Sequence, residues 1–204
     1  MARPIKYDDI EILDRATETL WLESPDCVTI RDLEAALDLK APSIYRRFGS
    51  REGLIARAVG HYVERVVDGR IRHFLDGADD PIAGLRAFFT SALEPVAGEA
   101  VPRGCLLTLT AGQSAFGDPE IGSTVTAGLA TIEAAFRRTL RRAQRSGQLA
   151  TGADIDAIAT LLLTSFEGIL LLARTGHGRL EASVEQLFAS LPDGQPPSKR
   201  LCPE

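Results

Sequence analysis

Apolar residues recur at helical spacing along nearly the whole chain, and this periodicity constrains the fold more than any other feature. Ile10, Leu13, Leu20 and Trp21 form the first apolar stripe, and later segments such as residues 121–140 repeat the pattern. Nowhere does a strand pattern alternate with helices, as a parallel sheet would require. The sequence therefore predicts an all-α fold of about nine helices.

Two short helices are predicted near the N-terminus. A capping box begins at Thr29, so a threonine hydroxyl and the acid three residues later satisfy backbone N–H groups at a helix start. Asp38 is a turn residue that tolerates the left-handed conformation. A second short helix follows over residues 41–48, with Pro42 in its first turn, where a missing N–H does no harm. Ser50 then caps a long fourth helix, and the whole predicts a helix-turn-helix unit.

The second of these helices lies in a cationic stretch of an acidic protein. The formal net charge is −5, yet four basic residues and only one acid lie between Leu39 and Leu54. Small, hydroxyl and basic side chains are expected to face outward there: Lys40, Ala41, Pro42, Ser43, Tyr45, Arg46 and Arg47. Such a face suits the major groove of DNA, because small side chains allow close approach and cations bind phosphates. The alternative is a solvated charged helix without a partner.

Composition and motifs exclude several other classes of protein. The 204 residues are 45% apolar and 25% charged, which is ordinary for a soluble globular protein. Three scattered cysteines and the lack of a secretory signal favour a cytoplasmic location. The three histidines are dispersed, and catalytic and nucleotide-binding motifs are absent. We therefore expect no enzymatic activity, no cofactor and no metal site.

The segment Ile155–Ala173 is apolar on nearly every face. Its length would suit a membrane span, but Asp156 and Glu167 interrupt it, and we expect no membrane insertion. A helix that is apolar all round is usually buried on more than one side, and a second apolar stripe follows over 180–191. Homodimerisation through these two helices is the expected explanation. The predicted interface residues are Ile158, Leu162, Phe166, Leu170, Leu180, Val184, Leu187 and Leu191.

The stretch Thr29–Leu54 closely resembles the DNA-binding signature of the TetR family of transcriptional regulators. Tyr45 to Phe48 matches the Tyr-x-x-Phe end of the family's recognition helix, and Ser50 to Leu54 matches its entry into the fourth helix. The chain departs from the signature at Asp38, where glycine is usual, and at Lys40, where a capping serine is usual. Beyond residue 60 the resemblance is one of helical layout only.

The resemblance implies a helix-turn-helix DNA-binding domain over 1–50, an effector-binding and dimerisation domain over 51–191 and a disordered tail over 192–204. It implies a homodimeric repressor that binds a palindromic double-stranded DNA operator and is released by a small-molecule effector. The implied phosphate contacts are Thr29, Arg31, Lys40, Ser43, Tyr45 and Arg51. Ala41, Pro42 and Arg46 are implied to face the major groove, with Arg46 reading a guanine edge.

An effector pocket is predicted among the central helices, with an apolar or uncharged ligand because the lining is mostly apolar. The candidate lining residues are Phe88, Phe89, Cys105, Thr108, Leu109, Gln113, Phe116, Thr126, Phe136 and Phe166. The aromatic members could equally be core residues. Cys105 lies near Arg103 at a helix start, and could be a sensing thiol or an inert buried cysteine.

A second function also fits the helical pattern: a small-molecule carrier or dimerisation module that does not bind DNA. The cations Lys40, Arg46 and Arg51 favour the regulator. Binding of a palindromic duplex, with an affinity that falls steeply with salt, distinguishes the two.

Overall fold

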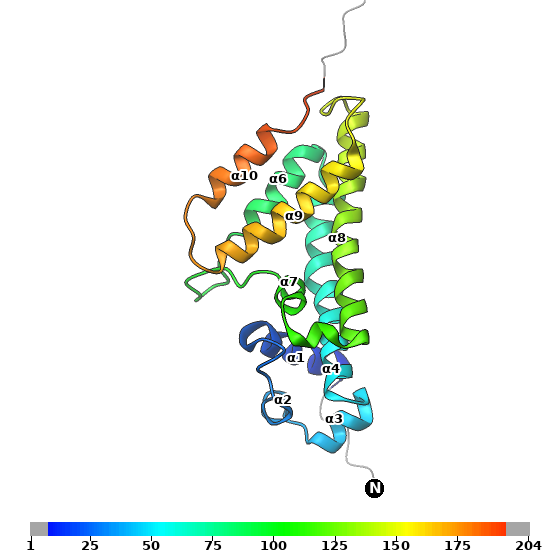
Figure 1. The fold of residues 1–204 in the computed structure, drawn as a ribbon, viewed down its shortest axis with the longest axis vertical. Coiled ribbons are helices and arrows are strands. Elements are labelled where there is room, and N and C mark those ends of the chain that lie inside the picture. The colour runs from blue at the N-terminus through cyan, green and yellow to red at the C-terminus, as the bar shows by residue number, and fades with distance from the viewer. Residues whose placement is uncertain (1–7, 195–204) are drawn as a thin grey trace, which may run out of the picture. The chain divides into compact units, whose positions relative to one another are not determined.

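A computed structural model describes residues 8–194, and over these the fold is almost entirely helical, as predicted (Figure 1). The only β pairing in this range is an isolated bridge between Leu149 and Asp193. The helices are α1 (Asp9–Glu23), α2 (Ile30–Leu37), α3 (Ala41–Phe48), α4 (Arg51–Tyr62), α5 (Asp68–Arg70), α6 (Pro81–Ser91), α7 (Leu106–Ala111), α8 (Pro119–Arg145), α9 (Ile155–Ala173) and α10 (Leu180–Ala189).

The helix that begins with α4 is longer than its α-helical part. π-Helical turns at Val63–Val67 and Ile71–Asp76 join α4 and α5 into one uninterrupted helical run from Arg51 to Asp76. Counted as one element, this run brings the α-helices among residues 8–194 to nine, the predicted number. A short 3₁₀ turn, Ser114–Gly117, follows α7.

The chain divides into two compact units that differ from the predicted domains. Within the described residues, unit 1 consists of residues 8–69 and 103–130, and unit 2 of residues 70–102 and 131–194. The first unit extends well past the predicted boundary at residue 50, because α4 packs against α1 and α3, and α7 packs against α4. The helix-turn-helix segment is therefore one part of a larger packed body.

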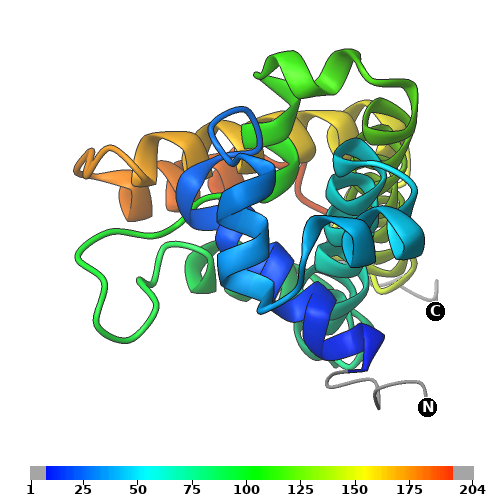
Figure 2. The same cartoon turned by 90° about the horizontal axis from the view of Figure 1, so that it is seen from below.

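Unit 1 is built around the apolar faces of α1 and α4. Five of its core side chains are at most 1% exposed: Ile12, Leu20, Leu33, Ile44 and Leu54. Each comes from an apolar stripe that is recognisable in the sequence. Helices α1 and α2 cross each other, and α3 lies beside the first turns of α4 (Figure 2). The outward faces of α2 and α3 are left to solvent.

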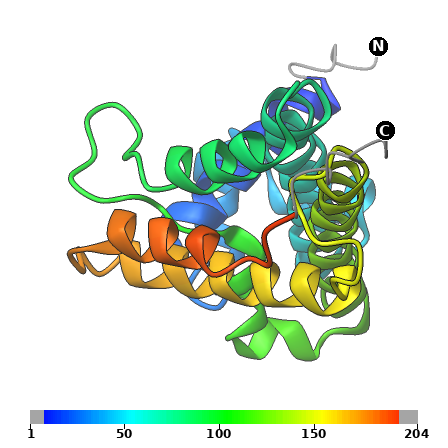
Figure 3. The same ribbon diagram turned by 90° about the horizontal axis from the view of Figure 1, so that it is seen from above.

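Unit 2 is held together by a cluster of phenylalanines from four helices. Phe88 and Phe89 of α6 contact Phe136 of α8, Phe166 of α9 and Phe188 of α10, with ring centroids 5.0 to 5.8 Å apart. Most of these rings meet edge to face or tilted, the arrangement that aromatic quadrupoles favour. Helix α10 runs alongside α9 (Figure 3). The aromatic residues of the sequence are therefore, in this unit, mainly core.

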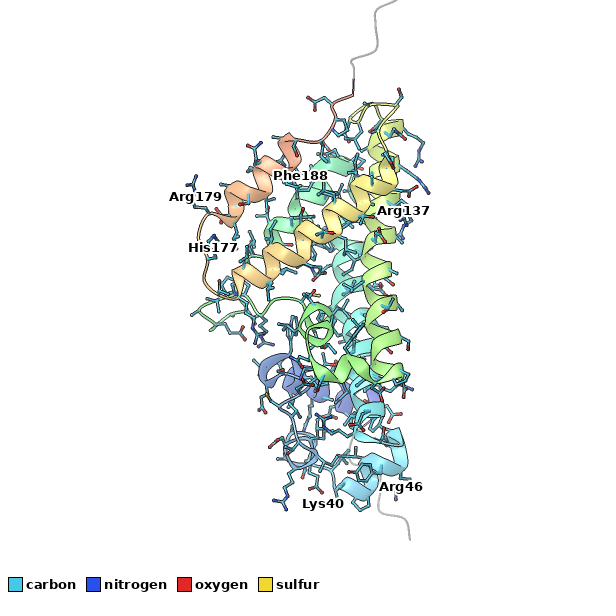
Figure 4. All side chains as sticks on the ribbon, viewed as in Figure 1. Lys40, Arg46, Arg137, His177, Arg179 and Phe188 are labelled. Atoms are coloured by element: carbon cyan, nitrogen blue, oxygen red, sulfur yellow. The ribbon has the colours of Figure 1, made fainter. Side chains whose placement is uncertain are left out.

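Helix α9 alone among the described helices is long and apolar enough to cross a membrane. Its most apolar stretch of 18 residues has a mean hydropathy of 1.8, and 39% of that stretch is buried within the protein. One side packs into unit 2 through Leu162, Phe166 and Leu170. Polar ties hold it as well, because Arg137 of α8, labelled in Figure 4, pairs with Asp156 at the start of α9. These contacts are those of a core helix in a globular unit.

The first residues of the predicted tail are part of unit 2. Ala150 donates a backbone hydrogen bond to Pro192 at 3.0 Å, and Gly194 donates one to Gln148 at 3.2 Å. The expectation of disorder from residue 192 onward is therefore corrected for residues 192–194. Residues 195–204 lie outside the described part of the chain.

Candidate nucleic-acid interface

The start of α2 is capped as the sequence predicts. The Thr29 hydroxyl accepts from the backbone N–H of Asp32, and the Asp32 carboxylate accepts in return from the Thr29 N–H at 2.8 Å. Hydrogen bonds from the Thr29 hydroxyl and N–H hold the pKa of the Asp32 carboxyl below its usual value. Both residues are exposed, so the capped first turn of α2 is accessible to solvent.

The turn between α2 and α3 is also the predicted one. Asp38 takes the left-handed conformation at φ 50°, which an aspartate tolerates better than most residues. Helix α3 then begins after Lys40, whose side chain makes no capping bond, and Pro42 lies in its first turn. Ser50 caps α4 by accepting from the N–H of Gly53 at 2.8 Å.

Most of the predicted DNA contacts lie on an accessible surface of unit 1. Lys40 and Arg46 are exposed, appear at the α3 end of the unit in Figure 4, and form no ion pair with a residue that the structure describes. Tyr45 is 45% exposed despite its large ring. Thr29, Arg31 and Pro42 are exposed as well, whereas Ala41 and Ser43 are half-buried.

A shallow concavity of about 600 Å³ lies beside these side chains. Its lining includes three hydroxyl-bearing residues: Tyr45 of α3 and the N-cap residues Thr29 and Ser50 of α2 and α4. Hydroxyls and helix N-termini are common partners of DNA phosphates. The concavity is lined as well by the Asp26 and Glu52 carboxylates and by Arg51, so its lining is of mixed charge.

Arg51 differs from the other predicted phosphate contacts. Its guanidinium donates to the Val28 carbonyl at 2.7 and 2.9 Å and to the Pro25 carbonyl, and only 25% of the side chain is exposed. These bonds fasten the loop between α1 and α2 to the start of α4. The structure thus gives Arg51 a structural role that the family resemblance did not imply.

Arg47 is similarly engaged within unit 1. Its Nε lies 3.2 Å from a carboxylate oxygen of Asp9. Of the four basic residues in the cationic stretch, two therefore serve the fold and two remain available. Sequence spacing alone could not separate them, because the partners are more than 20 residues away in the sequence.

The loop between α1 and α2 has a second attachment that sequence reasoning missed. The Asp26 carboxylate accepts from the backbone N–H groups of Ser114 and Ala115 at 2.8 and 2.9 Å. Gln113 accepts from the Asp26 N–H and donates to the Ser24 hydroxyl. The bonds to Ser114 and Ala115, together with the charge of Arg51, hold the pKa of Asp26 below its usual value.

The predicted effector-pocket residues fall into different surroundings. Four of the five phenylalanines of the set, Phe88, Phe89, Phe136 and Phe166, are at most 4% exposed in the cluster of unit 2. The other six belong to unit 1: Cys105, Thr108, Leu109, Gln113, Phe116 and Thr126. Of these, Phe116 and Thr126 are exposed, and Gln113 is bonded to the α1–α2 loop, so these three are surface or linking residues instead of lining residues.

Cys105 is buried and begins α7. Its sulfur lies 3.8 Å from the hydroxyl of Tyr62, and the Tyr62 ring meets Trp21 edge to face at 4.9 Å. Arg103, two residues earlier, pairs with Glu18 and lies over the Trp21 ring. The predicted neighbourhood of a thiol and an arginine is present, with the thiol shielded from solvent.

A separate concavity of about 400 Å³ lies within unit 2, and none of the predicted pocket residues lines it. It is formed by the segment after α6 and by the connection between α9 and α10, which carries His177 and Arg179 (Figure 4). No cluster of three or more metal-ligating side chains is found among residues 8–194.

The predicted dimer-interface set is corrected by the structure. Within the single chain, Leu162, Phe166, Leu170, Leu180, Val184 and Leu191 are all less than 9% exposed, and Ile158 and Leu187 are half-buried. The error has a simple physical cause: the most regular apolar stripe of a helix usually faces its own core. The apolar side chains of α9 that do face solvent are Leu161, Leu171 and Leu172, which are 45 to 50% exposed.

Comparison with known proteins agrees with this geometry. Residues 12–58 match the model for bacterial regulatory proteins of the tetR family, and residues 81–188 match the model for the tetracyclin repressor-like C-terminal domain. The Escherichia coli transcriptional repressor ComR is 23% identical over 186 residues, which are 91% of this chain and 86% of ComR. The transcriptional regulator AcuR of Cereibacter sphaeroides is 31% identical over 153 residues, which are 72% of this chain and 67% of AcuR.

Solved structures show the same architecture. A cysteine mutant of the TetR family regulator CifR, in complex with a 26-base-pair double-stranded operator DNA, matches with a TM-score of 0.83. That structure is 27% identical and covers 94% of this chain and 100% of the CifR chain. Because two family models match separate parts of the sequence, one of them over more than half of it, the chain belongs to the TetR family of DNA-binding transcriptional regulators.

Proposed function

We propose that the protein is a homodimeric repressor that binds a palindromic operator through α2 and α3 and releases it when a small molecule binds. The observation that carries this proposal is the pair of exposed cations Lys40 and Arg46 at the short helix α3 of an acidic protein, neither of which forms an ion pair with a residue between 8 and 194. The relative CifR, which is similar over nearly all of this chain, is seen with operator DNA.

Arg46 is the side chain proposed to read sequence. It is exposed on the last turn of α3, and an arginine fork pairs with the O6 and N7 atoms of guanine in the major groove. Selection from random duplexes by the wild-type protein should enrich a palindrome, and Arg46→Ala should weaken its binding by about 1–3 kcal/mol. Arg145→Ala, an exposed arginine at the end of α8, is the matched control and should bind like the wild type.

The salt dependence of binding and the enrichment of a palindrome together test the proposal. Contacts with phosphates release counterions, so the affinity for the enriched palindrome should fall steeply as salt rises. If selection at moderate salt enriches no palindrome, the proposal fails and the carrier without DNA binding takes its place.

A second copy of the chain is proposed to cover the exposed face of α9. Leu161, Leu171 and Leu172 lie on this face together with Gly168, where an added side chain would meet open space. Small residues between exposed leucines allow two helices to approach closely. Such a surface on a soluble regulator is typical of a protein–protein interface.

Charged substitutions test the dimer. Leu161→Glu with Leu172→Glu should convert the dimer into a monomer in sedimentation measurements, because burying two carboxylates in an apolar interface is unfavourable. Val96→Glu, which places the same charge on a different apolar side chain that is 47% exposed, is the control. If the doubly substituted protein is still a dimer, the interface does not lie on this face of α9.

Release by an effector is proposed to act through the α1–α2 loop. The segment that follows Cys105 reaches this loop through the Asp26 carboxylate, and the loop ends at the capping residue Thr29. A ligand that shifts α7 would therefore displace the start of α2. The sequence favours an apolar or uncharged ligand, and adding such compounds to a preformed operator complex should identify one that dissociates it.

A further inference from the structure

The recognition helix α3 begins without the side-chain cap that helices of its kind usually have. An α-helix leaves its first backbone N–H groups without intrahelical partners, and Ser, Thr, Asp or Asn at the N-cap normally satisfies one of them. Here the N-cap is Lys40, a donor that accepts nothing. Pro42 removes one N–H, and those of Ser43 and Ile44 both reach the Lys40 carbonyl, at 2.7 and 3.2 Å. Among residues 41–44, the N–H of Ala41 is then the one that still needs an acceptor.

Glu34 of the preceding helix supplies that acceptor. Its Oε1 accepts from the Ala41 N–H at 2.7 Å, a short bond of the charge-assisted kind. The same residue also uses its backbone, because its carbonyl accepts from Asp38 and from Leu39, the latter at 3.2 Å. Glu34 thus holds both ends of the turn that joins α2 to α3. Its half-buried position limits competition from water.

We propose that Glu34 is the positioning residue of the recognition helix, a cap supplied from α2 in place of a cap at Lys40. The inference rests on the proposed DNA-binding function and assigns Glu34 a part in it. Because α3 has only eight residues, its direction depends strongly on how its first turn is held. With Glu34 in place, position 40 carries a phosphate-seeking cation without loss of a defined helix start.

The carboxylate also has an electrostatic effect at the interface. It fixes a negative charge at the end of α3 that approaches the duplex, where it repels phosphates of any sequence and leaves base contacts intact. Non-specific binding is almost wholly electrostatic, so this charge weakens non-specific binding more than specific binding. Glu34 is therefore expected to raise the ratio of specific to non-specific affinity.

Two substitutions separate the hydrogen bond from the charge. Glu34→Gln keeps an oxygen acceptor and removes the charge, and should bind the selected operator within about twofold of wild type while binding non-specific duplexes several times more tightly. Glu34→Ala removes both, and should lose about three- to tenfold in operator affinity, the usual effect of deleting a cap. Equal operator affinity for wild type and Glu34→Ala, or equal losses for both variants, would overturn the proposal.

A change at position 40 provides the rescue experiment. Lys40→Ser installs an ordinary N-cap, which can accept from the Ser43 N–H. In this background Glu34→Ala should cost no more than about twofold, because a second cap now holds the helix start. An unchanged cost in the Lys40→Ser background would show that Glu34 does not act as a cap.

Hydrogen exchange tests the positioning role without DNA. In the free protein, the amides of Ala41 and of residues 43–48 should exchange faster in Glu34→Ala than in wild type, and at the wild-type rate in Glu34→Gln. If no variant binds DNA but the exchange pattern holds, the proposed function fails and the positioning role stands. If operator binding by wild type is confirmed and exchange is the same in all three proteins, the positioning role alone fails.

Discussion

The tip of α3 and the phenylalanine cluster of unit 2 are held in place by opposite means. Helix α3 buries Ile44 in the core of unit 1, but its two ends are held by directional bonds: Glu34 to its first N–H and Arg47 to Asp9. The cluster around Phe136 is held by close packing of rings, with little hydrogen bonding at its centre. Packing energy depends on filled volume, whereas a hydrogen bond depends on one donor and one acceptor.

This difference separates stability from function in the molecule. A ring removed from unit 2 leaves a cavity that its neighbours fill only partly, and this lowers the free energy of unfolding. A polar group removed from the surface of unit 1 leaves the core intact and changes the direction or freedom of α3. We therefore expect substitutions in the cluster to lower stability and substitutions around α3 mainly to change DNA affinity.

The largest effect is expected for Phe136→Ala. The Phe136 side chain is fully buried and touches the rings of Phe88, Phe89 and Phe166, so its removal should lower the free energy of unfolding by about 3–5 kcal/mol. Urea denaturation measures the change. Phe116→Ala, at a ring that is 39% exposed, is the matched control and should cost far less. Similar losses for both variants would contradict the assignment of the cluster as the core.

An intermediate effect is expected for Arg51→Met. The change leaves the Val28 and Pro25 carbonyls without their charged donor and should lower the free energy of unfolding by about 1–3 kcal/mol. Because the Arg51 side chain serves the fold, the slope of operator affinity against salt should stay at the wild-type value. A slope reduced by about one ion would instead make Arg51 a phosphate contact, as the family resemblance implied.

The smallest effect is expected from acid. Hydrogen bonds lower the pKa values of the Asp26 and Asp32 carboxyls in the folded protein, so folding favours their ionised forms. The stabilisation they contribute to the folded protein is fully present above the pKa of the unfolded state, about 4, and is lost as pH falls through the lower pKa values of the folded state. The melting temperature should therefore decline below pH of about 4, and less steeply in Asp26→Asn. An identical decline in that variant would show that Asp26 does not contribute to the pH dependence of stability.

Local features of the helix-turn-helix segment were predictable because neighbours in sequence determine them. The capping box at Thr29, the left-handed Asp38, the limits of α3 and the Ser50 cap all depend on residues within a few positions of each other. The outward cations Lys40 and Arg46 followed from the same helical spacing. Backbone hydrogen bonding at helix ends is short-range, and it leaves readable signals.

The sequence by itself determined the helical fold, the cationic tip and the family, since periodicity, caps and motif are properties of adjacent residues. Tertiary structure alone decided which arginines are available, that Glu34 caps α3, and that α9 turns its predicted interface inward while Leu161 and Leu172 face solvent. Each of these depends on which residues distant in sequence meet in space. The hydrophobic effect is non-directional, so an apolar stripe predicts that a helix face is buried but not which helix covers it. The covering helix is known only from the folded structure.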